Sequence, residues 1–116
     1  MDPAITVAIA ATYEETRLLA TRGRREVLQA RLASRPHRWA MPLLLESLAL
    51  AWQQPLRVVL FAESEALSSA LQLTDDLGLG RSTLFYEVEL LEPVGGGAEL
   101  CGGFEELRRW CRGERP

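Results

Sequence analysis

One acidic residue stands where α/β proteins commonly carry their chemistry. The continuous apolar run from Val58 to Ala62 has the length and composition of a strand that is buried on both faces. Glu63 follows this run directly. Ligands of parallel sheets meet the carboxyl ends of the strands, and carboxylates are the usual side-chain ligands of Mg²⁺. Glu63 is therefore the first residue to test for chemistry.

A second group of residues is cationic. Residues 17 to 38 contain seven arginines and a single acid, Glu26. Arginine binds phosphate as well as carboxylate, so this segment predicts a candidate nucleic-acid surface. Its members, together with a neighbouring aromatic residue, are Arg17, Arg22, Arg24, Arg25, Arg31, Arg35, Arg38 and Trp39. The alternative interpretation is a solvated hairpin on a protein of net charge −3.

The remaining reactive residues form no catalytic set. His37 is the one histidine, and no serine or cysteine stands out as its nucleophile. Cys101 and Cys111 alone predict neither a disulfide framework nor a metal site. Two glycine-rich stretches, residues 78–80 and 95–97, lack the lysine of a phosphate-binding loop. We therefore expect no metal and no cofactor.

The first half of the chain predicts strands and one helix. Residues 4–11 predict a central strand, because they are apolar throughout. Residues 17–22 and 25–32 predict an antiparallel hairpin that turns at Gly23, with residues 28, 30 and 32 on its covered face and 27, 29 and 31 on its wet face. A helix should then run from residue 39 or 41 to 53. It has few polar positions, which predicts a crossover helix that is buried on most sides.

The second half predicts a strand–helix–strand unit. The strand at 58–62 is followed by a helix that Ser64 caps and that Gly78 and Gly80 end. Leu67, Ala70, Leu71 and Leu77 are its expected core positions. Residues 82–91 predict the next strand, parallel to the first, and residues 104–111 predict a terminal helix. The expected fold class is therefore α/β with a mixed sheet.

Length and composition predict one domain. The chain has 116 residues, is 47% hydrophobic and 25% charged, and reads as a single domain over residues 1–116. It contains neither an apolar run of the roughly 18 residues that span a membrane nor the cationic start of a signal peptide. We expect an intracellular protein, cytoplasmic or nuclear, with no membrane contact.

Three meandering strands followed by strand–helix–strand crossovers resemble the ribonuclease H fold. The segment LATRGRREVLQA, residues 19–30, resembles the hairpin of that family. Residues 38–41 with residues 48–50 resemble its first helix. The segment FAESEAL, residues 61–67, resembles the motif that ends its fourth strand. Residues 95–107 resemble its glycine-rich loop and last helix. The resemblance covers nearly the whole chain.

This resemblance implies a site of four carboxylates that hold two Mg²⁺ ions on a phosphodiester. The first-strand and first-helix positions fall on Ala10 and Ala40, and the fourth-strand and last-helix positions fall on Glu63 and Glu105. Because the central shared ligand is lost, we expect a domain without catalytic activity. The alternative is a divergent Mg²⁺-dependent nuclease, with these carboxylates: Glu63, Glu105, Glu46 and Glu14.

A second resemblance is local. The segments LTDDLGLG and STLFYEVELLE, within residues 73–92, resemble the end of an FK506-binding prolyl isomerase domain, which implies an isomerase-like domain as a further alternative. The upstream aromatic pocket of that family is absent. We therefore expect a ribonuclease H-like binding module that docks a protein or binds nucleic acid. The acidic net charge favours a protein partner, and the oligomeric state is left open.

Overall fold

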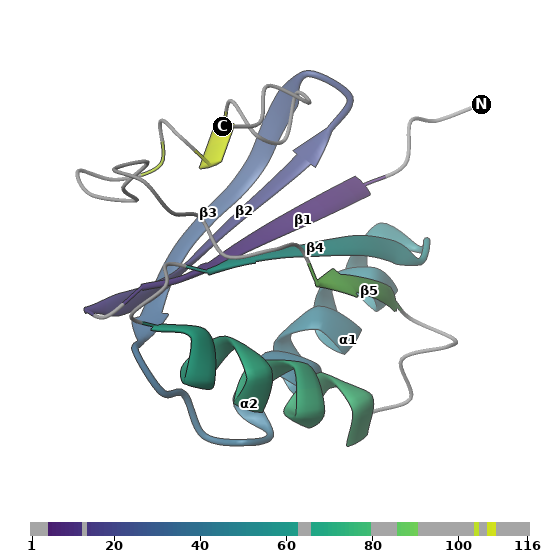
Figure 1. Cartoon of the computed structure of the whole chain (residues 1–116). Helices are drawn as coiled ribbons and strands as arrows, with labels where there is room; N and C mark the ends of the chain where they lie inside the picture. Colours follow the sequence, from purple (N-terminus) through teal and green to yellow (C-terminus); the bar gives the residue numbers. More distant parts are fainter. Residues whose placement is uncertain are drawn as a thin grey trace.

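The computed structural model describes residues 5–12, 14–62, 66–79, 86–90, 104 and 107–108. These residues form five strands and two helices, shown in Figure 1. The order is β1 (Ile5–Ala11), β2 (Glu15–Arg22), β3 (Arg25–Ala33), α1 (Ala40–Trp52), β4 (Leu56–Ala62), α2 (Leu67–Leu79) and β5 (Tyr86–Leu90). The predicted α/β class is confirmed.

The strands form one mixed sheet of order β3-β2-β1-β4-β5. Strands β1, β2 and β3 form an antiparallel meander, in which Ile9 lies opposite Leu18 and Leu18 lies opposite Ala30. β4 lies parallel to β1, and β5 lies parallel to β4. The predicted central place of the first strand is confirmed, because β1 has a neighbour on each side. Its seven residues are almost all buried, as a strand covered on both faces requires.

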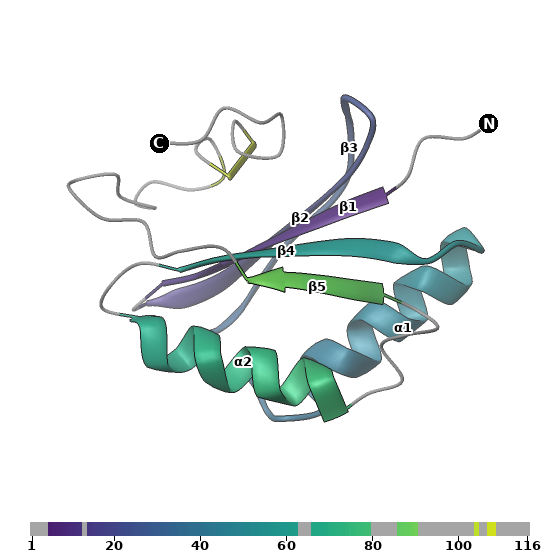
Figure 2. The same cartoon turned by 45° about the vertical axis from the view of Figure 1, so that its right-hand side comes forward.

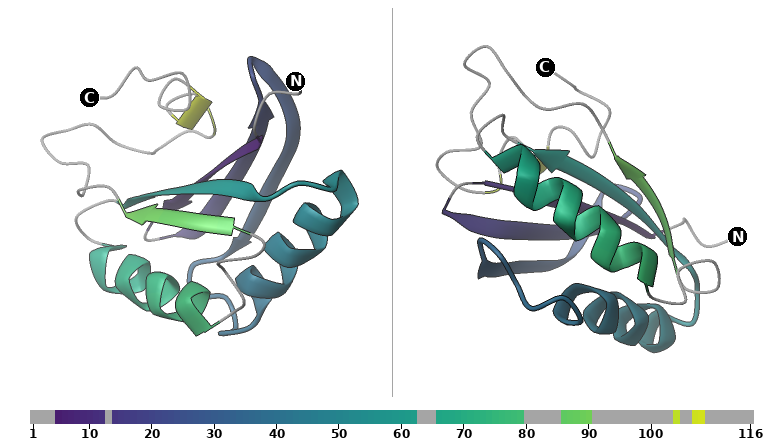
Figure 3. Two further views of the ribbon diagram at one scale, coloured as in Figure 1. Left: turned by 90° about the vertical axis from the view of Figure 1, so that its right-hand side faces the viewer. Right: turned by 60° about the horizontal axis from the view of Figure 1, so that its bottom comes forward.

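Both helices cover the same face of the sheet and contact each other (Figures 2 and 3). The core beneath them joins Ile5, Val7 and Ile9 of β1 to Met41 and Leu45 of α1. From α2, the core takes Ala70, Leu73 and Leu77. The alternation of the pleated strand directs residues 5, 7 and 9 to this face. Each of these two helices is 13 residues long. Among the described residues, no helix has both the length and the apolar composition of a membrane span.

The opposite face of the sheet carries a smaller core. Ala8 and Ala10 of β1 pack there with Leu19 and Phe61. Leu107 is fully buried against this cluster, and Phe104 is partly buried beside it. Of the predicted terminal helix at 104–111, the described residues include a helical stretch at Leu107 and Arg108, and the rest lies outside them. The small alanines leave space for Leu107 close to the sheet.

The hairpin of β2 and β3 departs from regular alternation at one point. Gly23 adopts a positive φ of 62° in the turn, which suits the first position of a tight hairpin turn. The pairing register then shifts between Ala20 and Thr21, where Val27 is the additional residue on β3. Because of this bulge, Val27 packs against the main core instead of lying on the predicted wet face. Beyond the bulge, the predicted alternation holds for Leu28, Ala30 and Leu32, which pack on the core.

Helix α1 begins and ends as predicted, but its burial differs. Pro42 lies in the first turn, and Gln53 ends the helix in the left-handed conformation two residues before Pro55. The prediction of a helix buried on most sides was wrong. Its buried residues are Met41, Pro42, Leu45 and Ala49, whereas Leu43 and Leu50 are exposed. The sheet and α2 contact the helix on other sides, so its outer face is left open among the described residues.

Helix α2 corrects two further details. It continues through Gly78 to Leu79, so Gly78 does not end it. Leu71 was expected in the core and is instead 48% exposed, while Leu73 is buried. β2 also starts two residues earlier than predicted, because a tight turn links Thr12 to Glu15. Thr12 Oγ1 donates to the Glu15 carbonyl at 2.7 Å and accepts the Glu15 N–H at 3.0 Å.

Candidate functional site

Two of the four positions that a ribonuclease H-like metal site would use lie within the described residues, and both are alanines. Ala10 is fully buried on the face covered by Leu107. Ala40 begins α1, which packs on the opposite face. Neither side chain has a ligand atom. Glu63 and Glu105 lie outside the described residues.

The other two proposed carboxylates lie apart. Glu14 is exposed in the turn after β1. Glu46 is half-buried, six residues into α1 from Ala40, or about 9 Å along the helix axis. Glu46 also raises the pKa of Tyr86, at the start of β5, after the larger effect of burial. It therefore faces the opposite end of the sheet from Glu14. The described residues contain no cluster of three or more potential metal ligands.

Two of the candidate arginines belong to an ion cluster. Arg17 and Arg31 are cross-strand partners in β2 and β3. Both reach the same oxygen, Glu15 Oε1, at 3.4 Å from Arg17 Nη2 and 2.9 Å from Arg31 Nη1. Arg17 is only 5% exposed, so the prediction that it lies on an exposed face of the hairpin was wrong. A buried guanidinium needs a charged partner, and Glu15 supplies one.

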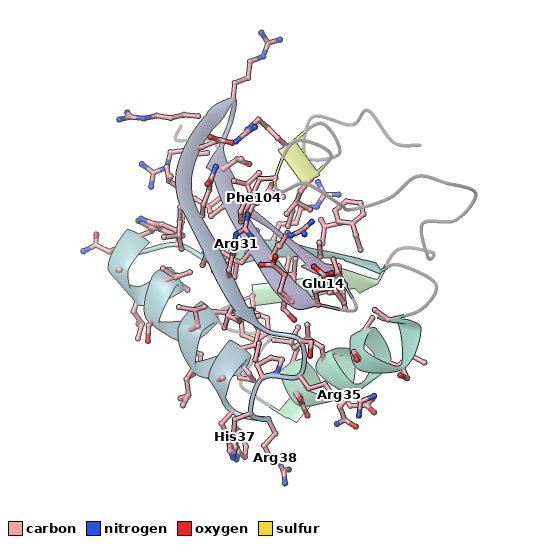
Figure 4. The ribbon with its side chains drawn as sticks, turned by 90° about the vertical axis from the view of Figure 1, so that its left-hand side faces the viewer. Glu14, Arg31, Arg35, His37, Arg38 and Phe104 are labelled. Atoms are coloured by element: carbon pink, nitrogen blue, oxygen red, sulfur yellow. The ribbon has the colours of Figure 1, made fainter. Side chains whose placement is uncertain are left out.

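The hairpin also contacts Phe104 and Arg108. The guanidinium of Arg31 lies over the Phe104 ring, 5.4 Å from its centroid. Figure 4 labels both side chains on this face of the sheet. Arg108 Nε forms an ion pair with Glu26 Oε1. These contacts join residues far apart in the sequence across the second face of the sheet. Arg31 therefore has a role in tertiary structure, although its side chain is partly exposed.

The remaining candidate arginines lie at two separate places. Arg24 and Arg25 are exposed at the tip of the hairpin, and Arg22 beside them is half-buried. Arg35 and Arg38 are exposed in the loop between β3 and α1 (Figure 4). The sheet separates these sites, because the tip follows β2 whereas the loop follows β3 at its far end. The sequence segment therefore does not fold into one continuous arginine surface.

The loop site continues into an apolar stripe. Arg38 stacks over Trp39 at 5.3 Å from the ring centroid. Trp39, Leu43 and Leu50 are 42%, 58% and 64% exposed. At 100° per residue these three positions fall within about 40° of one another around α1. We name Arg38, Trp39, Leu43 and Leu50 the α1 outer surface. The sequence predicted burial on most sides of this helix and did not single out these leucines, because an all-apolar helix does not show which side faces the sheet.

A pocket lies between the same loop and α2. Its volume is about 210 Å³. Its lining residues come from four places in the chain: Ala11, Thr16, Ser34, Arg35, Pro36, Ser68, Ser69, Gln72, Leu73 and Asp76. Sequence analysis did not identify this pocket. The one signal was Asp76, a charged residue placed between the apolar positions Leu73 and Leu77 of a helix.

His37 has a local structural role. Its Nδ1 accepts the N–H of Trp39 at 3.3 Å, and its carbonyl accepts the N–H of Ala40 at 2.8 Å. These bonds shape the loop that leads into α1. The prediction that His37 is not a catalytic base stays a prediction.

Comparison with known proteins adds no family. No family model matches the chain, and no curated protein matches it. The described residues form a small α/β arrangement with a mixed sheet and two helices. The candidate sites therefore rest on their own geometry.

Proposed function

We propose that this chain is a non-catalytic ribonuclease H-like domain that docks an acidic protein segment on the α1 outer surface. One observation carries the proposal: three large apolar side chains align on one face of α1, beside an arginine stacked on the first of them. Single exposed apolar residues are ordinary on protein surfaces. An aligned set, with an aromatic and an arginine, has the composition of the centre of a protein interface.

The ribonuclease H-like part of the proposal is supported by the arrangement of the elements. The resemblance implies an antiparallel meander followed by two crossovers. The sheet order, the antiparallel β2 and the parallel β4 and β5 agree with that expectation. The absence of catalysis is supported by the alanines at positions 10 and 40, which supply no metal ligand.

Charge favours an acidic protein segment over nucleic acid. Arg38 is exposed and stacks on the first apolar residue of the α1 outer surface, and complementary charge on the partner would orient it there. A nucleic-acid surface needs a longer continuous array of cations. The buried Arg17 and the separation of the hairpin tip from the loop reduce that array. The leucines would have no counterpart on a phosphate backbone.

A designed peptide tests the proposal. We would label an amphipathic Leu/Glu peptide about 18 residues long, which is about five helical turns, and measure its fluorescence anisotropy with the whole chain. A peptide with Lys in place of every Glu is its control. We expect the acidic peptide to bind at least about tenfold more tightly, which corresponds to about 1.4 kcal/mol. Equal affinities would remove the charge argument.

Variants then locate the interaction. Leu43→Ser combined with Leu50→Ser should weaken binding by about tenfold or more, because truncated hot-spot residues cost over about 1 kcal/mol each. Leu71→Ser is the matched control, since Leu71 is an exposed leucine on the other helix. If Leu71→Ser weakened peptide binding as much as the double variant does, the result would contradict the proposal. A dimer of the chain alone, seen in sedimentation and broken by the double variant, would assign the surface to a second copy and overturn it.

A parallel experiment tests whether the chain binds nucleic acid. Electrophoretic mobility shifts with duplex DNA and with an RNA–DNA hybrid should be absent at low salt, where phosphate contacts are strongest. A shift that is lost when Arg22, Arg24 and Arg25 are replaced by Gln would support the nucleic-acid alternative in place of protein docking. Binding at that tip would leave the α1 outer surface unexplained.

A further inference from the structure

The pocket beside α2 occupies a favoured place for ligands in an α/β sheet. Ala11 is the last residue of β1, which continues into β2 on one side of the sheet. Its parallel neighbour β4 leads through α2 to β5 on the other side. The carboxyl ends of two such strands form a switch point, where α/β proteins bind their ligands. Ala11 and α2 both line the pocket.

Asp76 forms one end of the pocket. Its side chain is only 5% exposed, and Gln72 Nε2 donates to its Oδ1 at 3.1 Å. Gln72 is its one hydrogen-bond donor within the described residues. A carboxylate accepts about four hydrogen bonds, and a buried carboxylate is costly without them. A cationic amine in the pocket would supply donors and opposite charge together.

Arg35 forms the other end. Its Nε donates to Ser69 Oγ at 3.4 Å, which places the guanidinium beside the first half of α2, as Figure 4 shows. Ser69 precedes Asp76 by seven residues, or about 10 Å along the helix axis. The remaining N–H groups of a guanidinium match a carboxylate. The two ends therefore carry opposite charges and stand well apart.

The wall between the ends suits a short aliphatic chain. Ala11, Pro36 and Leu73 line the pocket with apolar atoms, and the buried Thr16 is also part of the lining. A volume of about 210 Å³ lies below the usual range for drug-sized ligands, about 300–1,000 Å³. The occupant is thus a small molecule with few branches.

We propose that this pocket binds a small linear zwitterion, with its amine on Asp76, its carboxylate on Arg35 and its methylene groups on Leu73. The chemical class is that of ω-amino acids and basic amino acids, whose opposite charges are several bonds apart. This site is separate from the α1 outer surface and does not depend on it.

Three probes of one length test the proposal. Calorimetry and NMR titration of the whole chain would use 6-aminohexanoate, hexanoate and hexylamine. We expect 6-aminohexanoate to bind at least about tenfold more tightly than either single-charge probe, because only it satisfies both ends. Equal affinities, or no saturable change up to about 10 mM zwitterion, would overturn the proposal.

Two variants assign the ends. Arg35→Gln should make 6-aminohexanoate no better than hexylamine, and Asp76→Asn should make it no better than hexanoate. Arg38→Gln and Asp75→Asn are the controls, because both residues are exposed and do not line the pocket. Far-UV circular dichroism checks that Asp76→Asn folds. If Asp76→Asn does not fold, the test rests on the variant of the exposed Arg35. An unchanged preference of Arg35→Gln for 6-aminohexanoate over hexylamine would contradict the site.

Discussion

At the scale of single residues, the half-buried Glu15 and the buried Tyr86 show how the fold satisfies charge and hydrogen bonding. Glu15 lies between Arg17 and Arg31 and accepts contacts from both. Tyr86 is buried beneath α2, and its hydroxyl donates to the Leu77 carbonyl at 3.0 Å. The sequence alone could not pair Glu15 with Arg31 or Tyr86 with Leu77, because the folded chain brings these positions together.

Removing the charge of Glu15 should destabilise the hairpin. Glu15→Gln leaves Arg17 buried beside a neutral amide, and we expect a loss of about 1–3 kcal/mol in the free energy of unfolding. Urea denaturation at neutral pH measures it. Arg24→Gln is the control, because exposed charges contribute little. A loss as large as that of Glu15→Gln in the control would contradict a specific role for the Glu15 cluster.

Tyr86 predicts a loss of stability at alkaline pH. Burial, and secondarily the charge of Glu46, raise the pKa of Tyr86 above its usual 10.0. The unfolded state therefore loses the hydroxyl proton at a lower pH than the folded state does. The contribution of this hydroxyl to the free energy of unfolding is complete below pH 10.0 and is lost as the pH rises through the raised pKa. Tyr86→Phe should cost about 0.5–1.5 kcal/mol at neutral pH and should flatten the alkaline fall. Denaturation at several pH values tests this, and identical alkaline slopes would refute it.

At the scale of elements, sequence patterns predicted the type and the boundaries of the helices and strands better than they predicted which side of each element faces the core. The proline positions around α1 and the glycine of the hairpin turn gave the correct limits. The leucines of α1 gave no orientation, because a helix with apolar residues on every side fits several packings. Val27 was misplaced because a bulge leaves no clear trace in a short alternating strand.

The two faces of α1 should respond differently to truncation. Leu45 is fully buried, so Leu45→Ala should lower the free energy of unfolding by about 2–5 kcal/mol. Leu50→Ala, on the exposed side of the same helix, should change it by under about 0.5 kcal/mol. Thermal or urea denaturation of both variants provides the comparison. Similar losses would mean that the outer face is covered in solution.

At the scale of the whole molecule, the order of elements was predictable because length and turn signals separate them clearly. The pocket was not predictable, since it combines β1, β2, a loop and α2. The metal-site hypothesis followed the resemblance, and the described residues supply only alanine at two of its positions. Glu63 and Glu105 lie outside the described residues, so their role stays a prediction.

The alanines at positions 10 and 40 predict an absence of nuclease activity. Millimolar Mg²⁺ or Mn²⁺ should show no saturable binding in calorimetry and should support no cleavage of an RNA–DNA hybrid, because Mg²⁺ requires a nearly octahedral ligand set. Hydrolysis that disappears in Glu63→Gln would establish the nuclease alternative. Hydrolysis that persists in this variant would instead indicate a contaminating enzyme.

The central claim is that α1 presents a protein-docking surface, and NMR mapping of the bound acidic peptide tests it most directly. We predict chemical-shift changes at the Trp39 indole N–H and at the methyl groups of Leu43 and Leu50, with the Leu71 methyl groups unchanged. These four residues are exposed, so each can report contact. Changes confined to Arg24 and Arg25 at the hairpin tip, or changes at Leu71 without any at Leu43 and Leu50, would contradict the account.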